Sequence, residues 1–293
     1  MKNTLLALAV VIIGLLIGEY AARQVDWAGT RVLERNPEWY ETDAAGFRQP
    51  PTPLGARVPE LVRIAVLSGD ETWGPGVETQ YLWTVGLEKE LGGWAQVMNR
   101  ALLGANAAGS AATIASVMPD KPDIILWAVS PAMLLESPDT MDPNPARWPA
   151  WWRLGTMLER ALLSGRQAAM QSGNRNGRLA AAGGSPDSPG IRLLDGSLNL
   201  IGEMVISNGG RLVAFILPDF GQDANYSLLP VHDQMAATFR RWNVPVIDPV
   251  VNYRMQDTRM LRLDRFHFVP SNEGHEFLAK EAAKGLRGLS LAP

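Results

Sequence analysis

The sequence predicts a three-layer α/β/α domain, flavodoxin-like in type, with a parallel sheet of about five strands and one N-terminal transmembrane helix before it. Two observations predict the domain. From residue 61 onward, short apolar runs alternate with stretches of helical periodicity, which is typical of a parallel sheet covered on both faces. A glycine turn over 69–76 also joins the first apolar run to the first helix, as in sheets that bind ligands beyond the carboxyl ends of their strands.

Each strand is predicted from a short apolar run bounded by turn residues or by a helical pattern. The run 122–129 is apolar without alternation, which favours a strand buried on both faces. The helix after the first strand places Leu82, Val85 and Leu87 on one apolar face. The predicted strands are 63–67, 95–99, 122–129, 211–217 and 244–247. The predicted helices are 80–91, 110–117, 193–207, 229–242 and 273–286.

The N-terminus predicts a membrane anchor over residues 1–23, with a helix crossing the bilayer at 4–22. Lys2 precedes an apolar run that is marginally long enough for a span of about 20 residues. A cleaved signal peptide is the alternative, but the residues near Ala21 lack the small-x-small pattern of a cleavage site. A membrane-proximal connector follows at 24–60, and its aromatic side chains either lie at the lipid surface or pack on the domain. These side chains are Trp27, Trp39 and Tyr40.

The globular domain is predicted over 61–293, and an insert at 137–190 interrupts its alternation of strands and helices. The insert contains Trp148, Trp151 and Trp152. We interpret them as packing a lid on the domain, with a membrane-interface or partner-binding patch as the alternative. The end of the insert, 171–190, is rich in Gly, Ser, Ala and Pro and predicts a mobile surface loop.

The composition excludes several classes of function. The net charge of −3 gives no basis for a nucleic-acid partner. Cysteine is absent, which excludes disulfides, a thiol nucleophile and thiolate metal sites. Residues 69–76 lack the spacing of a dinucleotide fingerprint, so we expect no cofactor. A metal held by Asp70, Glu71 and His267 would lack a second well-placed histidine, so we expect no metal site.

Residues 66–77 read Val-Leu-Ser-Gly-Asp-Glu-Thr-Trp-Gly-Pro-Gly-Val. This stretch resembles the first sequence block of the SGNH (GDSL-type) hydrolases, many of which read Gly-Asp-Ser-x-Thr-x-Gly-x-Gly-Val. The nucleophilic serine of that block is missing here. The best superposition omits one residue after Asp70, and without a gap Glu71 occupies the place of the serine.

Three further blocks follow in the order of that family. Asn99 and Gly104 resemble the second block, which implies that the amide of Gly104 lies in an oxyanion hole. In the third block, Ala132 stands where the family has an oxyanion-hole asparagine. Asp264 and His267 are similar to the family's Asp-x-x-His, which implies that His267 is a general base oriented by Asp264.

The residues themselves leave other roles open. An Asp three residues before a His accepts a hydrogen bond from one ring nitrogen, and this serves a structural turn as well as a general base. Replacement nucleophiles would be Ser68 at the end of the first strand, Thr72 after the turn, or Glu71 itself. We expect His275 to begin the closing helix and pack on the sheet, and His232 to be an ordinary histidine of a loop or helix end.

The resemblance and the two losses together predict a pseudoenzyme. It would be anchored in the cell inner membrane with its domain in the periplasm, as an accessory subunit or scaffold of a photosynthetic, respiratory or envelope assembly. Its expected partners are integral membrane proteins. The alternative is an active esterase or O-acyltransferase that acts on acyl groups of cell-envelope sugars through His267, Asp264 and a non-standard nucleophile. A third reading is a module that binds an acylated sugar or lipid without turnover.

Overall fold

The computed structural model describes residues 13–20, 40, 42–43, 46–48, 58, 60–135, 175–263 and 268–292. Residues 13–20 are helical and belong to the predicted anchor, whose other residues lie outside the described ranges. Within those ranges, no helix has both the length and the apolar character needed to cross a membrane. The tryptophans of the insert lie outside the described residues, and so do Asp264 and His267.

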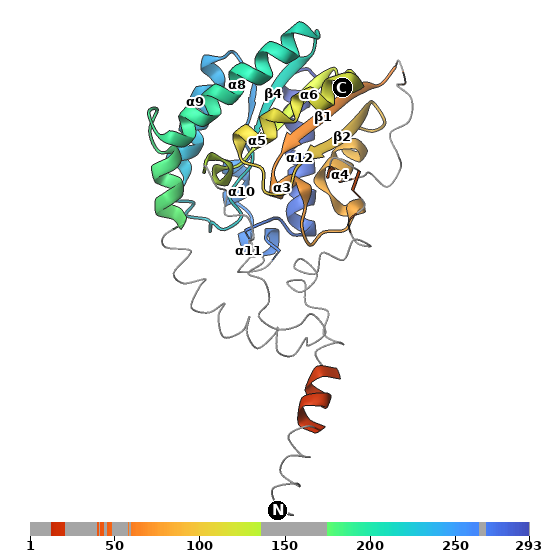
Figure 1. Cartoon of the computed structure of the whole chain (residues 1–293), viewed down its shortest axis with the longest axis vertical. Helices are drawn as coiled ribbons and strands as arrows, with labels where there is room; N and C mark the ends of the chain where they lie inside the picture. The colour runs from red at the N-terminus through yellow and green to blue at the C-terminus, as the bar shows by residue number, and fades with distance from the viewer. Residues whose placement is uncertain are drawn as a thin grey trace, which may run out of the picture.

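Five parallel strands form one sheet in the order β2-β1-β3-β4-β5 (Figure 1). The predicted five-stranded parallel sheet is therefore confirmed, and this strand order is that of flavodoxin-like folds. The strands are β1 Val62–Ser68, β2 Ala95–Ala101, β3 Ile124–Val129, β4 Arg211–Ile216 and β5 Val246–Ile247.

Nine α-helices have described bounds, together with three short 3-10 helices. The α-helices are α3 Asp70–Trp73, α4 Trp83–Glu90, α5 Ala107–Ala112, α6 Ile114–Val117, α8 Pro189–Ser207, α9 Leu229–Arg241, α10 Val250–Arg254, α11 Thr258–Leu261 and α12 Asn272–Gly288. The 3-10 helices are η2 Thr79–Tyr81, η3 Met118–Asp120 and η4 Pro131–Leu134. All five predicted helices are present, the first two of them each divided into two shorter pieces.

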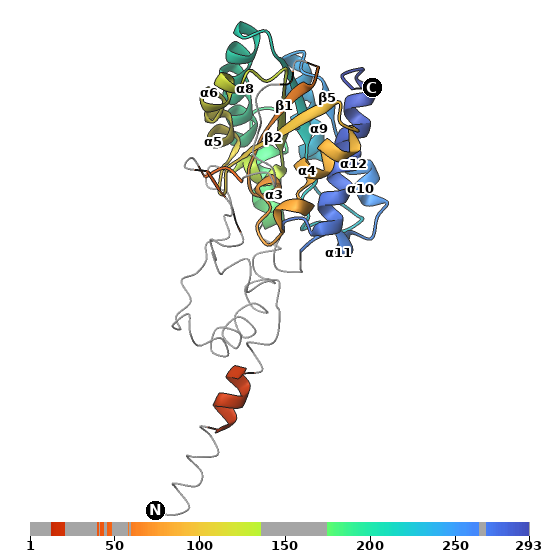
Figure 2. The same ribbon diagram turned by 90° about the vertical axis from the view of Figure 1, so that its right-hand side faces the viewer.

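Helices cover both faces of the sheet (Figure 2). On one face, Trp127 of β3 donates from Nε1 to Ser110 Oγ of α5 at 2.9 Å and meets the ring of Phe239 in α9 edge-on at 5.7 Å. On the other face, Trp83 of α4 meets the ring of Phe215 in β4 edge-on at 5.4 Å. Every residue of β3 is buried, because side chains from both helical layers pack against it.

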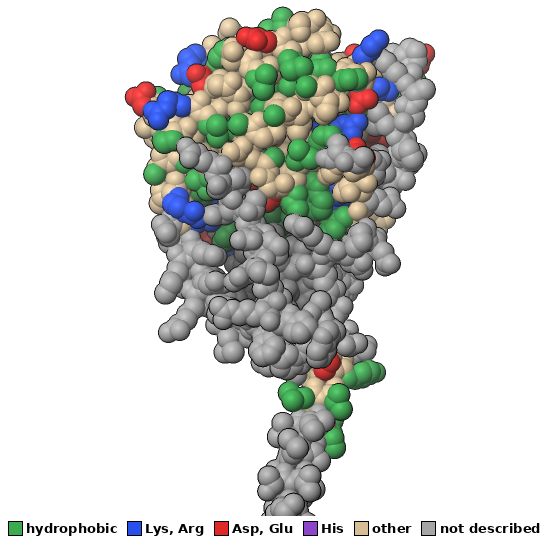
Figure 3. Space-filling view, viewed as in Figure 1, with side chains coloured by type: hydrophobic (Ala, Val, Ile, Leu, Met, Phe, Trp, Pro, Cys, Tyr) green, Lys and Arg blue, Asp and Glu red, His purple; other side chains and the backbone are tan. Residues whose placement is uncertain are grey.

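The helical layer that contains α5 and α6 presents a surface with few charges at its centre. Between Arg100 and Asp120 the sequence has no charged residue. In the view of Figure 3 the described charged side chains lie toward the margins of the domain, while apolar and uncharged polar groups cover the middle. Since α5 consists of Ala, Gly and Ser, it packs closely on α8 beside it.

Helix α3 was not predicted, since the sequence suggested only a turn at this point. It is a single turn, too short to create a periodic pattern. Gly69 precedes it, and Gly74 ends it in the left-handed region at φ 74°. A side chain at Gly69 would collide with the loop after β2, since an ideal Cβ there would lie 2.6 Å from the carbonyl oxygen of Ala105.

The prediction of a loop over 171–190 is wrong for residues 175–183 and 189–190, while residues 184–188 form turns between two helices. Residues 175–183 are helical, and Leu179 is fully buried. Alanine is the strongest helix former, and 180–182 are all alanine. Gly183 and Gly190 allow close contact, because an ideal Cβ would lie 2.5 Å from Val231 Cγ1 at the first position and 2.5 Å from the carbonyl oxygen of Leu134 at the second. Small residues here permit close packing instead of mobility.

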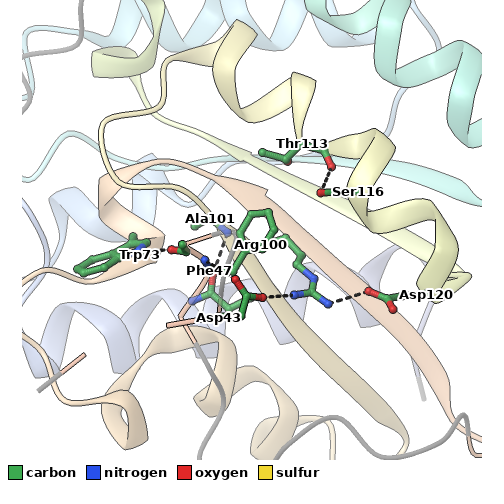
Figure 4. Close-up of polar contacts among 10 residues, drawn as sticks. Asp43, Phe47, Trp73, Arg100, Ala101, Thr113, Ser116 and Asp120 are labelled. Atoms are coloured by element: carbon green, nitrogen blue, oxygen red, sulfur yellow. Dashed lines mark hydrogen bonds and ion pairs between the residues drawn. The ribbon is translucent and has the colours of Figure 1, made fainter. Parts of the chain in front are cut away.

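Part of the predicted connector packs onto the domain. Phe47 is 4% exposed and Arg48 is 1% exposed. Figure 4 shows Phe47 beside Arg100, whose guanidinium lies 5.2 Å from the ring centroid and bridges Asp43 and Asp120 at 3.4 and 2.7 Å. Of the two readings for Tyr40, packing on the domain is the one observed, since its ring lies 4.9 Å from that of Trp73.

Candidate functional site

The candidate site lies at the carboxyl edge of the sheet, between the ends of β1 and β3. The chain leaves β1 toward β2 on one side and then returns past it to β3 on the other, so the strand order reverses between these two strands. Ligands in open α/β sheets usually bind at such a reversal. Here the side chain of Glu71, just after β1, is joined to that of Ser130, just after β3, by a hydrogen bond of 2.6 Å from Ser130 Oγ to Glu71 Oε1.

Glu71 is a buried acid in this position. Its exposure is only 5%, and Ser130 is fully buried. Burial raises the pKa of Glu71 to about 7, against the hydrogen bond from Ser130, which lowers it. The neighbouring carboxylates of Asp70 and Asp219 contribute to this rise in the pKa. Near pH 7 this carboxyl group is therefore divided between its protonated and ionised forms.

The backbone amide of Gly104 does not face an open position. It donates to Asp70 Oδ1 at 2.5 Å. Burial raises the pKa of Asp70, and this hydrogen bond opposes the rise. Gly104 adopts φ 74°, a left-handed conformation that favours glycine, so the turn itself accounts for this residue. The amide that the resemblance assigned to an oxyanion hole is thus already hydrogen-bonded to a side chain of the protein.

The two hydroxyl groups considered as replacement nucleophiles are both inaccessible. Ser68 ends β1 as predicted, is fully buried, and has no hydrogen-bond partner for its Oγ among the described residues. Thr72 is also fully buried, and its Oγ1 accepts a hydrogen bond from Trp83 Nε1 at 3.1 Å. Asn99 donates from Nδ2 to the carbonyl oxygen of Thr72 at 3.2 Å, so this second-block residue holds α3 in place. A nucleophile must reach its substrate, and neither hydroxyl is exposed to one.

An ion pair occupies the same edge of the sheet after β4. Arg175 Nη1 lies 2.6 Å from Asp219 Oδ2, and both side chains are almost fully buried. The guanidinium of Arg175 lies 4.4 Å from the ring centroid of Phe268, the residue that follows His267 in the sequence. Phe268 also fills the space over Gly221, where an ideal Cβ would lie 2.6 Å from its Cδ1. Sequence analysis missed this pair because its members are far apart in the chain and Arg175 was placed in a loop.

His232 is not the ordinary histidine that was expected. It is 1% exposed in α9, and its Nδ1 lies 3.1 Å from both carboxylate oxygens of Asp248. Its Nε2 lies 2.7 Å from the hydroxyl of Tyr226, which accepts a hydrogen bond from the amide of Asp219 at 2.7 Å. A carboxylate beside Nδ1 assigns the proton to that nitrogen, so Nε2 accepts from the Tyr226 hydroxyl. This chain of hydrogen bonds holds Asp219, and with it the ion pair to Arg175. No local sequence pattern marks it.

His275 begins the closing helix, as expected, but it contacts α4 where the sheet was expected. It is fully buried in the first turn of α12, which Ser271 caps by accepting a hydrogen bond from the amide of Gly274 at 3.1 Å. Its Nδ1 accepts a hydrogen bond from the amide of Trp83 at 3.1 Å. Burial, together with the nearby charge of Arg48, lowers the pKa of His275 to about 3. The ring is neutral and joins α12 to the start of α4.

The structure brings together five of the predicted site residues and leaves two untested. Ser68, Asp70, Glu71 and Thr72 lie together at the end of β1, with the amide of Gly104 beside Asp70. Asp264 and His267 lie outside the described residues, so their roles remain predictions. Their described neighbours are paired, since the amide of Leu263 donates to the carbonyl oxygen of Val269 at 2.9 Å. In the part of the chain that the structure describes, no three acidic or histidine side chains converge as metal ligands.

Comparison with known proteins gives structural similarity without a family assignment. No family model and no curated protein matches this sequence. Among solved structures, a lipase/acylhydrolase from Enterococcus faecalis is 12% identical, with a TM-score of 0.47 over 78% of this chain and 97% of the other. A carbohydrate acetylesterase family member from Sinorhizobium meliloti is 12% identical, with a TM-score of 0.45 over 79% of this chain and 99% of the other. A member of the lipolytic protein G-D-S-L family from Veillonella parvula is 14% identical, with a TM-score of 0.45 over 76% of this chain and 97% of the other. We therefore infer function from this chain's own residues.

Replacing Glu71 by glutamine is expected to remove a pH-dependent loss of stability. Because the folded pKa of about 7 exceeds the ordinary value of 4.5, the folded state binds the proton more tightly, and the free energy of unfolding falls as pH rises from 4.5 to 7. The full difference corresponds to about 3 kcal/mol. Relative to the natural chain, Glu71→Gln should gain most of this by pH 8 and almost nothing at pH 4.5. Urea unfolding followed by circular dichroism across this range measures it, with Glu203→Gln on the exposed side of α8 as the control. Parallel pH profiles for Glu71→Gln and the natural chain would contradict the prediction.

Proposed function

We propose that this chain is a non-catalytic α/β protein, tethered to the inner membrane by its N-terminal segment, that serves as an accessory subunit or scaffold for integral membrane proteins. The observation that carries the proposal is the hydrogen bond between Glu71 and Ser130. It lies between the two strands where a ligand would enter, and its two side chains are buried. At the strand ends, where a substrate would bind, this hydrogen bond joins two loops.

The chemistry of the neighbouring groups supports the same proposal. An esterase of the resembled type needs a nucleophile and an oxyanion hole. Loss of a nucleophilic serine alone costs on the order of 10⁶ in rate, and loss of one oxyanion donor costs roughly 10²–10³. By the resemblance, no serine follows Asp70, since the position is either omitted or taken by Glu71, and Ala132 stands in the asparagine position. The amide of Gly104 is bound to Asp70. The carboxylates of Glu71 and Asp70 and the amide of Gly104 are thus engaged in hydrogen bonds within the protein.

The test is purification of the full chain from its native membranes in a mild detergent, followed by mass spectrometry of the proteins that accompany it. We expect integral membrane proteins in a fixed ratio to the chain, and no hydrolysis of short-chain p-nitrophenyl esters above that of a His267→Ala variant. A chain that purifies alone and hydrolyses esters in a manner that depends on His267 would overturn the proposal.

One observation favours a second candidate, which is ester hydrolysis or acyl transfer with a hydroxyl group other than the missing serine. Ser130 Oγ lies 2.6 Å from Glu71, and a carboxylate with a pKa of about 7 suits a general base near neutral pH. Burial of both side chains opposes this candidate. It would require ester turnover that Ser130→Ala abolishes and Ser68→Ala leaves unchanged, measured on the same membrane-bound chain.

A further inference from the structure

We propose that α10 and α11 form a lipid-docking surface, by which the domain rests on a bilayer that contains anionic lipids. The inference goes beyond the proposed tether, on which it rests, because it assigns a second contact with the membrane to the folded domain itself. The docking surface consists of Val251, Arg254, Met255, Arg259 and Met260.

Three large apolar side chains are exposed together on this surface. Val251 is 64% exposed, Met255 is 78% exposed and Met260 is 59% exposed. Val251 lies in the first turn of α10 and Met255 is its C-cap residue, which keeps helical geometry, so the two side chains are four residues apart and project from the same side. Tyr253 and Leu261 are buried and fix the two helices to the domain. The helices that carry the exposed side chains are therefore packed against the domain, which favours a binding surface over a frayed segment.

Arginine residues border the same apolar side chains. Arg254, Arg259 and Arg262 occur within the stretch 250–263, where Asp257 is the only acid. Asp257 is bound to Arg259 at 2.9 Å, and this hydrogen bond raises the pKa of Arg259, with a smaller contribution from the charge of Asp223. The stretch keeps a positive balance in a chain whose net charge is −3. Arg254 and Arg259 are adjacent in the sequence to the exposed Met255 and Met260. Exposed apolar groups next to arginine are typical of surfaces that lie at the boundary of headgroups and acyl chains.

The position of α11 agrees with this role. In both ribbon views α11 lies at the end of the domain that is nearer to helix 13–20, the described part of the predicted anchor (Figures 1 and 2). A tether that holds the domain near a bilayer raises the local concentration of lipid at such a surface, so a weak affinity is sufficient. The carboxyl edge of the sheet lies at the same end, because α10 and α11 follow the end of β5 and precede the start of α12.

The absence of cysteine makes a direct test practical. A single cysteine introduced by Met255→Cys, or separately by Met260→Cys, can carry a fluorophore on the full chain in nanodiscs. Ile206→Cys is the matched control, since Ile206 is also 78% exposed but lies in the last turn of α8, where the chain approaches the opposite edge of the sheet. The probe is quenching by lipids that carry a spin label in the upper part of the acyl chain.

We expect quenching at residues 255 and 260 to be several times stronger than at residue 206 in nanodiscs that contain phosphatidylglycerol. This difference in quenching should shrink in nanodiscs of pure phosphatidylcholine. It should also shrink when Arg259→Glu is combined with each single-cysteine variant. Equal quenching at all three positions, or none at 255 and 260, would overturn the docking surface while leaving the tether intact. Failure of the chain to enter nanodiscs at all would instead overturn the tether of the proposed function. Protection of residue 255 from thiol reagents only when membrane proteins are present would assign the surface to a protein partner and also overturn the proposal.

Discussion

Replacing Arg48 by methionine is expected to lower the free energy of unfolding by about 3–5 kcal/mol, because it removes a buried charged donor that several backbone carbonyls share. Arg48 Nη1 donates to the carbonyl oxygens of Trp73 and Gly74 at 3.3 and 3.0 Å. Nη2 donates to the carbonyl oxygen of Val77 and to Thr79 Oγ1, both at 3.0 Å. Methionine fills a similar volume and donates nothing, so these oxygens would remain buried without a partner.

Chemical unfolding of the full chain in detergent measures the effect, with Arg241→Met on the exposed end of α9 as the control. Arg241 pairs with Asp195 while 56% exposed, and removal of such a pair costs little. Arg48→Lys should recover only part of the loss, since a lysine cannot reach acceptors on both sides as the planar guanidinium does. If Arg48→Met unfolds with the same midpoint as Arg241→Met, residues 40–48 do not stabilise the domain.

Acidification is expected to destabilise the natural chain much more than a His275→Asn variant. The folded pKa of His275, about 3, lies below the ordinary value of 6.5, so the folded state binds fewer protons between these values. Stability is therefore fully present above pH 6.5 and is lost as pH falls toward 3. The loss attributable to this group is about 3 kcal/mol at pH 4 and roughly 4 kcal/mol at pH 3. Asparagine does not titrate, and its Oδ1 can accept the hydrogen bond from the amide of Trp83.

The measurement is the difference between the unfolding free energies of the two chains at pH 7, 5 and 4. Comparison of the chains at each pH is needed, because Glu71 contributes with the opposite sign between pH 4.5 and 6.5. As pH falls, the unfolding free energy of the natural chain should decrease relative to that of His275→Asn. A gap that is constant with pH would show that His275 is protonated without cost in the folded chain.

The strands of the sheet could be predicted from the sequence because each strand is marked by its own apolar residues. A buried parallel strand needs a continuous apolar run, and each predicted run became a strand within two residues of its expected bounds. The departures from the resembled sequence blocks, with no serine directly after Asp70 and alanine at position 132, are also readable in the sequence alone. Helix α3 and the helical residues 175–183 escaped prediction for local reasons too. The first is a single turn, and the second is hidden in a stretch whose composition suggested a loop.

The candidate site could be predicted only in part, because its contacts join residues that are far apart in the sequence. That Ser68, Asp70, Glu71 and Thr72 lie at the end of a strand followed from the sequence. The partner of Glu71 did not, because Ser130 is 59 residues away and nothing in either stretch specifies the other.

The chain by itself thus determined its fold class, the order in which strands and helices occur, and the absence of a serine directly after Asp70. Only the tertiary structure decided that Glu71 accepts a hydrogen bond from Ser130 and that Asp70 accepts one from the amide of Gly104. It also decided that His232 is connected to Asp219 through the hydroxyl of Tyr226. The physical reason is that the energy of a buried polar group depends on the partner it meets, and in a parallel sheet those partners come from loops far apart in the sequence.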